Sequence, residues 1–171
     1  MKVIIVTGTP GTGKTTISRA ICRKLGYRYI DVKKISREHN LREGYDNKRN
    51  CYIIDEEKLC NVLIKEIRNQ KNSVRRKNFS GIVIDSHLSH YLPKEYVELC
   101  IVVKCRLKIL EQRLRKRGYN KGKIRENMDC EIFDVCYHEA IENGHKVLII
   151  NNDYKKEENL RFVKKIIHSL P

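Results

Sequence analysis

Apolar residues in this chain follow two kinds of pattern. Continuous runs at residues 2–7, 81–85, 99–103 and 147–150 have the length of buried strands, and residues 27–31 alternate as a short strand does. Between these runs, apolar residues recur at the three- and four-residue spacing of amphipathic helices. Strands that alternate with helices predict an α/β fold, in which a parallel sheet is flanked by helices. Functional side chains are then expected at the carboxyl ends of the strands.

Five segments have the helical spacing, and their predicted extents are residues 17–25, 55–67, 107–114, 124–140 and 160–170. Asp55 is the expected N-cap of the second helix. Gly26, Gly118 and Gly144 follow three of the segments as stop signals. Residues 124–140 are therefore predicted to form one uninterrupted helix.

Two segments lack a core pattern. Residues 32–54 are irregular and polar, with a turn signal at 44–47, and this composition favours a small inserted lobe over a core element. Residues 69–80 are basic and loop-like, and their cationic cluster consists of Lys71, Arg75, Arg76 and Lys77. The whole chain, residues 1–171, is expected to form one domain.

The first strand leads directly into a glycine-rich loop. Residues 8–15 read GTPGTGKT and match the phosphate-binding pattern G-x-x-x-x-G-K-[ST], with a strand before it and a helix after it. Gly8, Gly11 and Gly13 allow positive φ and a close approach of the main chain to a polyphosphate. The N–H groups at the start of the following helix would then face the anion. The sequence therefore predicts a binding site for a nucleoside triphosphate.

Three side chains at the end of this loop have predicted roles. Lys14 would place a positive charge between the β- and γ-phosphates. The hydroxyl group of Thr15 would coordinate Mg²⁺, and Thr16 can reach an α-phosphate oxygen. These residues make Mg·ATP the expected substrate form.

A second strand ends in Asp85, which has the character of a Walker B carboxylate that holds Mg²⁺ through water. The alternative is a strand-end aspartate that caps the next turn. His87 lies two residues further on and is a candidate for contact with the γ-phosphate or the attacking group. Considered alone, a histidine at this position is more often a surface residue.

Arginines offer candidate phosphate ligands. Arg113 and Arg117 are four positions apart in a predicted helix and so share a face, which suits a phosphoryl group in transfer. A solvated basic face is the alternative, because other cations lie close by in the sequence. Arg37, in the expected lobe, is a candidate for holding an acceptor phosphate.

Composition adds two constraints. The chain has 36 lysines and arginines against 21 acidic residues, a formal charge of +15 that would attract a polyanion such as RNA. A surface that is simply rich in lysine explains the charge equally well. The seven cysteines are odd in number, include no C-x-x-C pair and have no zinc-ligand spacing. Several lie within apolar stretches and are expected to be small core residues. With no signal peptide or membrane span evident, we expect an intracellular protein.

Several of these motifs together resemble the adenylate kinase isoenzyme 6 family, whose eukaryotic members are nuclear adenylate kinases and ribosome-assembly ATPases and which has archaeal relatives. The resemblance spans nearly the whole chain. The matching stretches are residues 8–16, 85–87, 113–119, 42–46, 53–56, 126–127 and 130–133. The loop is shared by many NTPases, whereas the combination of Asp-x-His at 85–87 with Arg-Gly-Tyr at 117–119 is more specific.

The resemblance implies an enzyme that transfers the γ-phosphoryl group of Mg·ATP to AMP, with ATPase activity and a role in small-subunit rRNA maturation. Residues 31–54 would form the monophosphate-binding lobe, with Arg37 on AMP. Residues 116–126 would form a short lid, with Arg117 on ATP. The implied partners are a small-subunit ribosomal protein and rRNA. The implied location is the cytoplasm, or the nucleus in a eukaryote, and a monomer is expected.

Two other functions remain open at this point. One is an assembly factor whose ATP cycle drives a conformational switch with little true kinase role. The other is a P-loop kinase for another small-molecule acceptor. A GTPase is disfavoured, because the guanine-binding pattern Asn-Lys-x-Asp does not occur.

Overall fold

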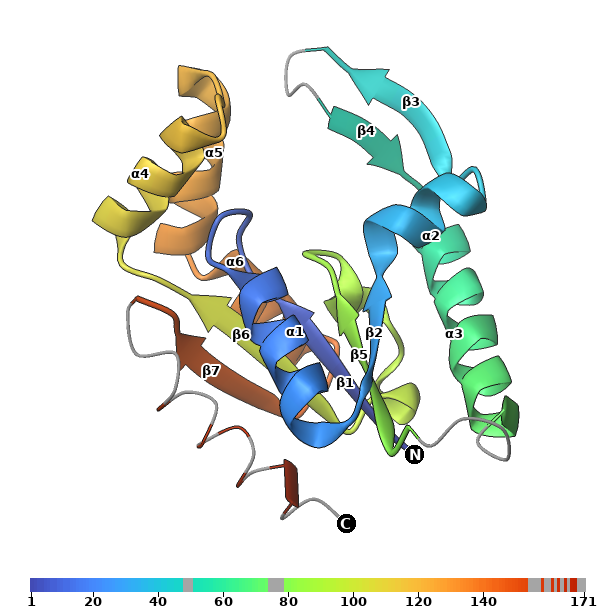
Figure 1. Ribbon diagram of the computed structural model, residues 1–171. Helices are drawn as coiled ribbons and strands as arrows, with labels where there is room; N and C mark the ends of the chain where they lie inside the picture. The colour runs from blue at the N-terminus through green and yellow to red at the C-terminus, as the bar shows by residue number, and fades with distance from the viewer. Residues whose placement is uncertain are drawn as a thin grey trace.

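The computed structural model describes residues 1–47, 51–73 and 79–153, and six positions near the C-terminus, 158, 161, 163, 165, 167 and 168. Five strands form one parallel sheet with the order β2-β5-β1-β6-β7 (Figure 1). They are β1 (Lys2–Thr7), β2 (Arg28–Asp31), β5 (Gly81–Asp85), β6 (Leu99–Lys104) and β7 (Val147–Asn151). All five coincide with predicted strands, and the predicted α/β fold is confirmed.

Helices cover both faces of the sheet. Ile4 and Val6 of β1 pack towards α1 (Lys14–Leu25) and the C-terminal segment, whereas Val3 and Ile5 pack towards α3 (Glu56–Ser73) and α6 (Val135–Glu142). All four side chains are fully buried. Burial of each contributes roughly 1.5–3 kcal/mol, which explains why the strands lack polar alternation. β1 is thereby held at the centre of the molecule, and the loop that follows it starts from a rigid base.

The predicted helix over residues 124–140 is in fact two helices. α5 spans Lys121–Ile132 and α6 spans Val135–Glu142, and the backbone of Asp134 between them has a φ of 52°. A left-handed residue ends a helix, and aspartate tolerates this conformation better than most residues. The apolar spacing continued across the break because both helices bury apolar residues. The pattern therefore did not reveal the interruption.

α4 (Leu107–Lys116) and α5 form a helical pair that encloses a small apolar cluster of its own. The pair rises beyond the carboxyl ends of the strands on one side of the molecule (Figure 1). The chain between these helices turns at Gly118, whose φ is 72°, as its position in the sequence predicted.

Residues 32–54 are better ordered than their composition predicted. They form α2 (Val32–Glu38) and an antiparallel hairpin of β3 (Arg42–Asp46) and β4 (Cys51–Ile54), separate from the main sheet. The predicted turn at 44–47 is wrong, since most of it lies in β3. Cross-strand ring contacts stabilise the hairpin: Tyr45 and Tyr52 stack edge to face at 5.0 Å, and the Arg42 guanidinium lies 3.8 Å from the Tyr52 ring centre. These side chains are mostly exposed, so no buried face produced a strand pattern.

Other predictions are resolved in part. Asp55 caps α3, accepting a hydrogen bond from the Lys58 N–H at 2.9 Å. α3 continues to Ser73, so the start of the segment predicted as a loop is helical. The cluster at 75–77 lies outside the described residues, as does much of the predicted closing helix. Of that helix, Val163 and Ile167 are described, helical and buried.

The seven cysteines are all free thiols, and the buried ones are Cys22, Cys100, Cys105 and Cys136. Among the described helices, none combines the length and apolarity that crossing a bilayer would require.

Candidate functional site

The phosphate-binding loop joins β1 to α1 and requires glycine for local reasons. Gly8 has a φ of 131°, and a Cβ there would lie 2.3 Å from the Val103 carbonyl oxygen. Gly13 has a φ of 100°, and its Cβ would lie 2.1 Å from Nδ2 of Asn152. Gly11, with a φ of 104°, lies against Leu110 of α4. A side chain at Gly8 or Gly13 would collide with its neighbours, so the loop tolerates neither substitution.

The Lys14 side chain folds over the loop. Its ammonium group donates hydrogen bonds to the carbonyl oxygens of Gly8 at 2.6 Å and Thr9 at 3.1 Å. Burial lowers the pKa of Lys14 to about 8, and the nearby Asp85 carboxylate offsets only part of that effect. A phosphate oxygen would be a stronger acceptor than these carbonyls, so the site favours an anion beside Lys14.

The two predicted magnesium ligands lie beside each other. Asp85 is the last residue of β5, in register with Val6 of β1, and Thr15 lies in the first turn of α1. The Tyr29 hydroxyl is 2.8 Å from Oδ2 of Asp85 and also hydrogen-bonds the Thr15 side chain. Burial and the Asp85 carboxylate raise the pKa of Tyr29, so its hydroxyl keeps its proton.

This set of oxygen atoms fits Mg²⁺, which binds one or two protein oxygens together with water and substrate phosphates. Within the described part of the chain, no group of three or more His, Cys, Asp or Glu side chains could hold a metal ion independently. Sequence reasoning missed Tyr29, because its contact with Asp85 depends on the pairing of β2 with β5 in the folded sheet.

His87 lies just beyond Asp85 and keeps an exposed surface. The surrounding protein and the positive charge of Lys14 lower the pKa of His87 below its usual range. The ring is therefore neutral at pH 7 and can donate or accept a hydrogen bond. Its predicted contact with the γ-phosphate or the attacking group stays a prediction.

Arg113 contacts the loop from behind. Its guanidinium donates to the carbonyl oxygens of Gly11 at 3.4 Å and Thr12 at 3.1 Å, and to those of Asn152 at 3.1 Å and Asp153 at 3.5 Å. In this conformation Arg113 therefore supports the main chain of the loop. Asn152, which sequence reasoning missed, adds a bond from its side chain to the Thr12 carbonyl at 2.9 Å.

Arg117 and Arg37 belong to α4 and α2, two helices that lie on opposite sides of the loop (Figure 1). Arg117 is exposed at the C-terminal end of α4, and its charge lowers the pKa of Lys14, which places it within electrostatic reach of the loop. Arg37 is exposed in the last turn of α2. Lys33, four residues earlier and thus on the same helix face, acts electrostatically on both Lys14 and His87. Lys33 is a further candidate phosphate ligand that the sequence pattern did not reveal.

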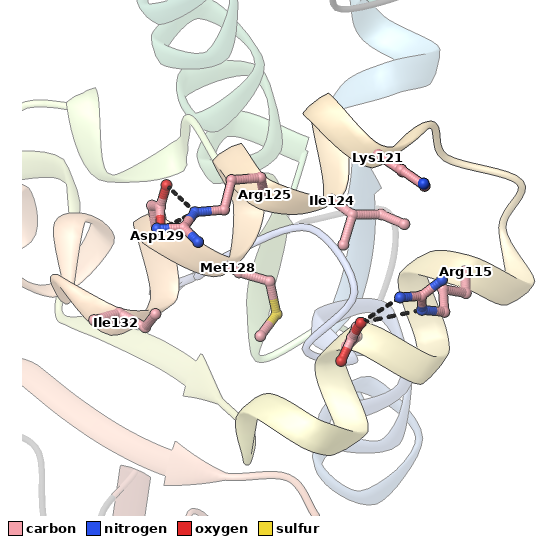
Figure 2. Close-up of a pocket in the computed structure, with 8 residues that line it drawn as sticks. Arg115, Lys121, Ile124, Arg125, Met128, Asp129 and Ile132 are labelled. Carbon is pink, nitrogen blue, oxygen red and sulfur yellow. Dashed lines mark hydrogen bonds and ion pairs between the residues drawn. The ribbon is translucent and has the colours of Figure 1, made fainter.

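A separate groove lies between α4 and α5, with a volume of about 310 Å³. Ion pairs between Arg115 and Glu111 and between Arg125 and Asp129 lie along it, around the apolar side chains of Ile124 and Met128 (Figure 2). Lys121, Ile124 and Arg125 of the predicted lid line this groove, but none of the predicted phosphate, metal or catalytic residues does.

Comparisons with known proteins agree with this geometry. A family model described as an AAA domain matches residues 4–134. The adenylate kinase isoenzyme 6 homolog of Caenorhabditis elegans is 37% identical over 140 residues, which cover 82% of this chain and 72% of that protein. The homolog of Dictyostelium discoideum is 37% identical over 151 residues, covering 86% and 78%. The Saccharomyces cerevisiae homolog FAP7 is 35% identical over 157 residues, covering 90% and 75%.

Solved structures of P-loop kinases share the fold. Shikimate kinase from Bacteroides thetaiotaomicron superposes with a TM-score of 0.55 at 17% identity, covering 98% of both chains. Deoxyadenosine kinase from M. mycoides with bound dATP has a TM-score of 0.56 at 17% identity, covering 99% of this chain and 100% of that one. At this identity the likeness establishes the architecture alone.

Proposed function

The chain belongs to the adenylate kinase isoenzyme 6 family, and we propose that it transfers the γ-phosphoryl group of Mg·ATP to AMP and releases two ADP. The observation that carries the proposal is the arrangement around the loop. Lys14, Thr15 and Asp85 converge at the carboxyl ends of β1 and β5, and Tyr29 links the last two. This arrangement suits a polyphosphate with a bound cation.

The donor phosphates would lie in the loop. Main-chain N–H groups at the start of α1 and the Lys14 ammonium would neutralise the β- and γ-phosphates, and Arg117 would approach from α4. Thr15 would hold Mg²⁺ directly and Asp85 through water. Bound Mg²⁺ supplies further charge neutralisation on the phosphate oxygens. Phosphoryl transfer needs positioning and charge more than covalent chemistry, so a dedicated general base is not required.

The acceptor would approach from the side of α2 and the hairpin. Arg37 is the proposed ligand of the AMP phosphate, and Lys33 on the same face extends positive charge towards the loop. Water can replace AMP at the γ-phosphate, and we propose ATP hydrolysis as a second activity of the site. His87, held neutral beside Lys14, is the side chain suited to orienting that water.

The direct experiment is steady-state phosphoryl transfer from Mg·ATP to a panel of nucleoside monophosphates and to shikimate, with a water-only control. The proposal expects AMP to give the highest kcat/KM and a slower release of phosphate to water. A preference for a non-nucleotide acceptor would identify a kinase of another class. Turnover of ATP with water alone would reduce the function to an ATPase.

The acceptor site is tested with a matched pair of variants. Arg37→Ala should raise the KM for AMP about tenfold and leave ATP hydrolysis unchanged, because water needs no phosphate anchor. Lys34→Ala is the control, since Lys34 lies on the same helix but pairs at the surface with Glu38. Equal effects of the two substitutions on the KM for AMP would remove Arg37 from the acceptor site.

A role in ribosome assembly is a second candidate, favoured by the charge of +15, which exceeds what a nucleotide substrate requires. We propose that the partners are a small-subunit ribosomal protein and rRNA. Copurification at physiological salt of one ribosomal protein, in a ratio that changes between ATP and ADP, would support this role. Binding that ignores the nucleotide state would contradict an ATP-driven switch.

A further inference from the structure

Two cysteines meet beside the phosphate-binding loop. Cys130 lies in α5 and Cys136 in α6, and the Cys136 thiol donates a hydrogen bond to the Cys130 sulfur. In one continuous helix, residues six apart would be separated by about 9 Å along the axis and point roughly 120° apart. The break at Asp134 is therefore what brings the two sulfur atoms together.

The Cys130 sulfur also contacts the loop itself. The Thr9 hydroxyl donates to it at 3.7 Å, and Thr9 is 1% exposed. The carbonyl oxygen of the same residue accepts from the Lys14 ammonium and, at 2.9 Å, from the Thr12 hydroxyl. Thr9 thus links the Cys130 sulfur to Lys14, the principal predicted phosphate ligand. A chemical change at this sulfur can therefore reach Lys14 through one residue.

The surroundings fix this pair in place. The Glu131 side chain accepts a hydrogen bond from the Cys105 N–H at 3.0 Å, which holds the end of α5 against β6. Lys104 pairs with Asp134 at the break. Cys136 is buried, whereas Cys130 keeps part of its surface exposed, so a small oxidant can reach one sulfur of the pair.

We propose that Cys130 and Cys136 form a reversible oxidation site that controls nucleotide binding through Thr9. The Cys130 thiolate attacks one oxygen atom of hydrogen peroxide, the O–O bond breaks, the other oxygen leaves as hydroxide, and the cysteine becomes a sulfenic acid. The Cys136 sulfur then attacks the Cys130 sulfur, a disulfide forms, and water is released. In balance, two thiols and one hydrogen peroxide give one disulfide and two waters.

The thiol pKa distinguishes Cys130 from four other cysteines, Cys22, Cys60, Cys100 and Cys105. Hydrogen bonds from Cys136 and, to a lesser extent, from Thr9 lower the pKa of Cys130, against the effect of burial. The burial of Cys22, Cys60, Cys100 and Cys105 raises the pKa of each of these thiols. The thiolate is the reactive form, so Cys130 reacts ahead of them.

The disulfide has a direct mechanical consequence. Bonded sulfur atoms lie about 2.05 Å apart, closer than hydrogen-bonded thiols, so Cys130 moves towards α6 and its sulfur ceases to be a charged acceptor. The Thr9 hydroxyl then faces a neutral sulfur, which is a weaker acceptor. This bond supports the loop and does not contact the nucleotide itself, so we expect its weakening to lower nucleotide affinity by no more than one hydrogen bond contributes, roughly two- to tenfold.

The chain offers a clean mass test. Both cysteines lie in one tryptic peptide, residues 126–146, which has no internal lysine or arginine. After treatment with hydrogen peroxide at pH 7 and alkylation of the remaining thiols, we expect this peptide to be unalkylated and about 2 Da lighter, and to recover two alkylation sites after dithiothreitol. A peptide 126–146 that stays fully alkylated while other cysteines oxidise would overturn the site.

The coupling to the loop is tested by ADP binding, measured with peroxide-treated and re-reduced protein. Binding does not require phosphoryl transfer, so this test is independent of the proposed kinase activity. Oxidised protein should bind two- to tenfold more weakly, and reduction should restore the affinity. Equal affinity of disulfide-bonded and reduced protein would overturn the control of nucleotide binding.

Two variants complete the test. Cys136→Ala should abolish the mass change and leave a sulfenic acid at Cys130 that dimedone traps. Cys51→Ser is the matched control, because Cys51 is also partly exposed but lies in the hairpin. It should retain both the disulfide and the affinity change. Loss of both in Cys51→Ser would place the oxidation site elsewhere, and mapping of the wild-type peptide decides the matter even if Cys136→Ala fails to fold.

Discussion

Lys14 illustrates how one residue couples protonation to ligand binding. Its ammonium group is held by two carbonyl oxygens of the loop, and burial lowers its pKa to about 8. A bound diphosphate would place anionic oxygens beside the ammonium and raise the pKa again. Above pH 8 the complex therefore carries more protons than the free protein, and rising pH must weaken binding.

The first prediction concerns this linkage. The Kd for ADP, measured by calorimetry in EDTA so that no metal contributes, should be constant near pH 7 and rise up to about tenfold per pH unit above pH 8. Lys14→Ala should bind weakly at pH 7 and lose this dependence. Lys33→Ala, which removes a neighbouring cation, should retain it. A wild-type Kd that does not change between pH 7 and 9.5 would contradict the role of Lys14.

The second prediction separates hydrolysis from transfer. His87 is neutral and partly exposed, and water needs a polar group to orient it, whereas AMP carries its own phosphate anchor. His87→Ala should therefore slow ATP hydrolysis at least about tenfold more than AMP phosphorylation. Asp85→Ala should impair both rates through the shared metal. Both rates are measured at the same Mg·ATP concentration. If His87→Ala slowed ATP hydrolysis and AMP phosphorylation equally, His87 would have a structural role only.

At the scale of the elements, the loop depends on a strand and a helix far away in the sequence. Asn152, just after β7, donates to the Thr12 carbonyl at 2.9 Å, and its own N–H donates to the Lys104 carbonyl at 2.7 Å. Arg113 of α4 donates to the same Thr12 carbonyl at 3.1 Å. These bonds occupy carbonyl groups of the loop and so hold its N–H groups ready for phosphate.

The third prediction tests this support. Arg113→Ala should lower the free energy of unfolding by about 1–3 kcal/mol, because buried carbonyl groups lose a charged donor, and should weaken ADP binding in parallel. Arg115→Ala is the matched control on the same helix, since its partner Glu111 is a surface ion pair worth less than about 1 kcal/mol. Urea denaturation and ADP titration supply the two measurements. If Arg113→Ala and Arg115→Ala changed the free energy of unfolding and the ADP affinity equally, the loop would not need Arg113.

At the scale of the whole molecule, the sequence carries a formal excess of 15 positive charges. Such a charge attracts RNA, and the attraction weakens with salt through counterion release. The cluster of Arg75, Arg76 and Lys77 lies outside the described residues, so its contribution rests on the sequence alone.

The fourth prediction addresses that cluster. Replacement of all three residues with alanine should reduce the slope of log K against log salt for single-stranded RNA by about two, and leave kinase activity intact. A variant with alanine at three exposed cations elsewhere, Arg23, Lys34 and Lys108, is the charge-matched control. A greater loss of slope in the control variant would exclude the cluster as an RNA contact.

Many of the strands and helix ends were predicted from local sequence. The strands were predicted because burial on both faces demands continuous apolar runs. The helix ends at Gly26 and Gly118 were predicted because glycine adopts, without strain, the left-handed conformation that follows the last helical turn. The hairpin at 42–54 was missed, since its contacts are between exposed rings of opposite strands. The break at Asp134 was missed because the apolar spacing persists across it.

The sequence by itself determined the phosphate-binding loop and the order of its ligands. Phosphate is bound there by main-chain groups and adjacent side chains, which require glycine, lysine and threonine at fixed local positions. The tertiary structure alone decided which distant residues join them. Tyr29 reaches Asp85 because β2 lies next to β5, Arg113 reaches the loop because α4 packs behind it, and Cys130 meets Cys136 because a helix ends between them. Strand order and helix termination arise from packing over the whole chain, so no local spacing encodes these contacts.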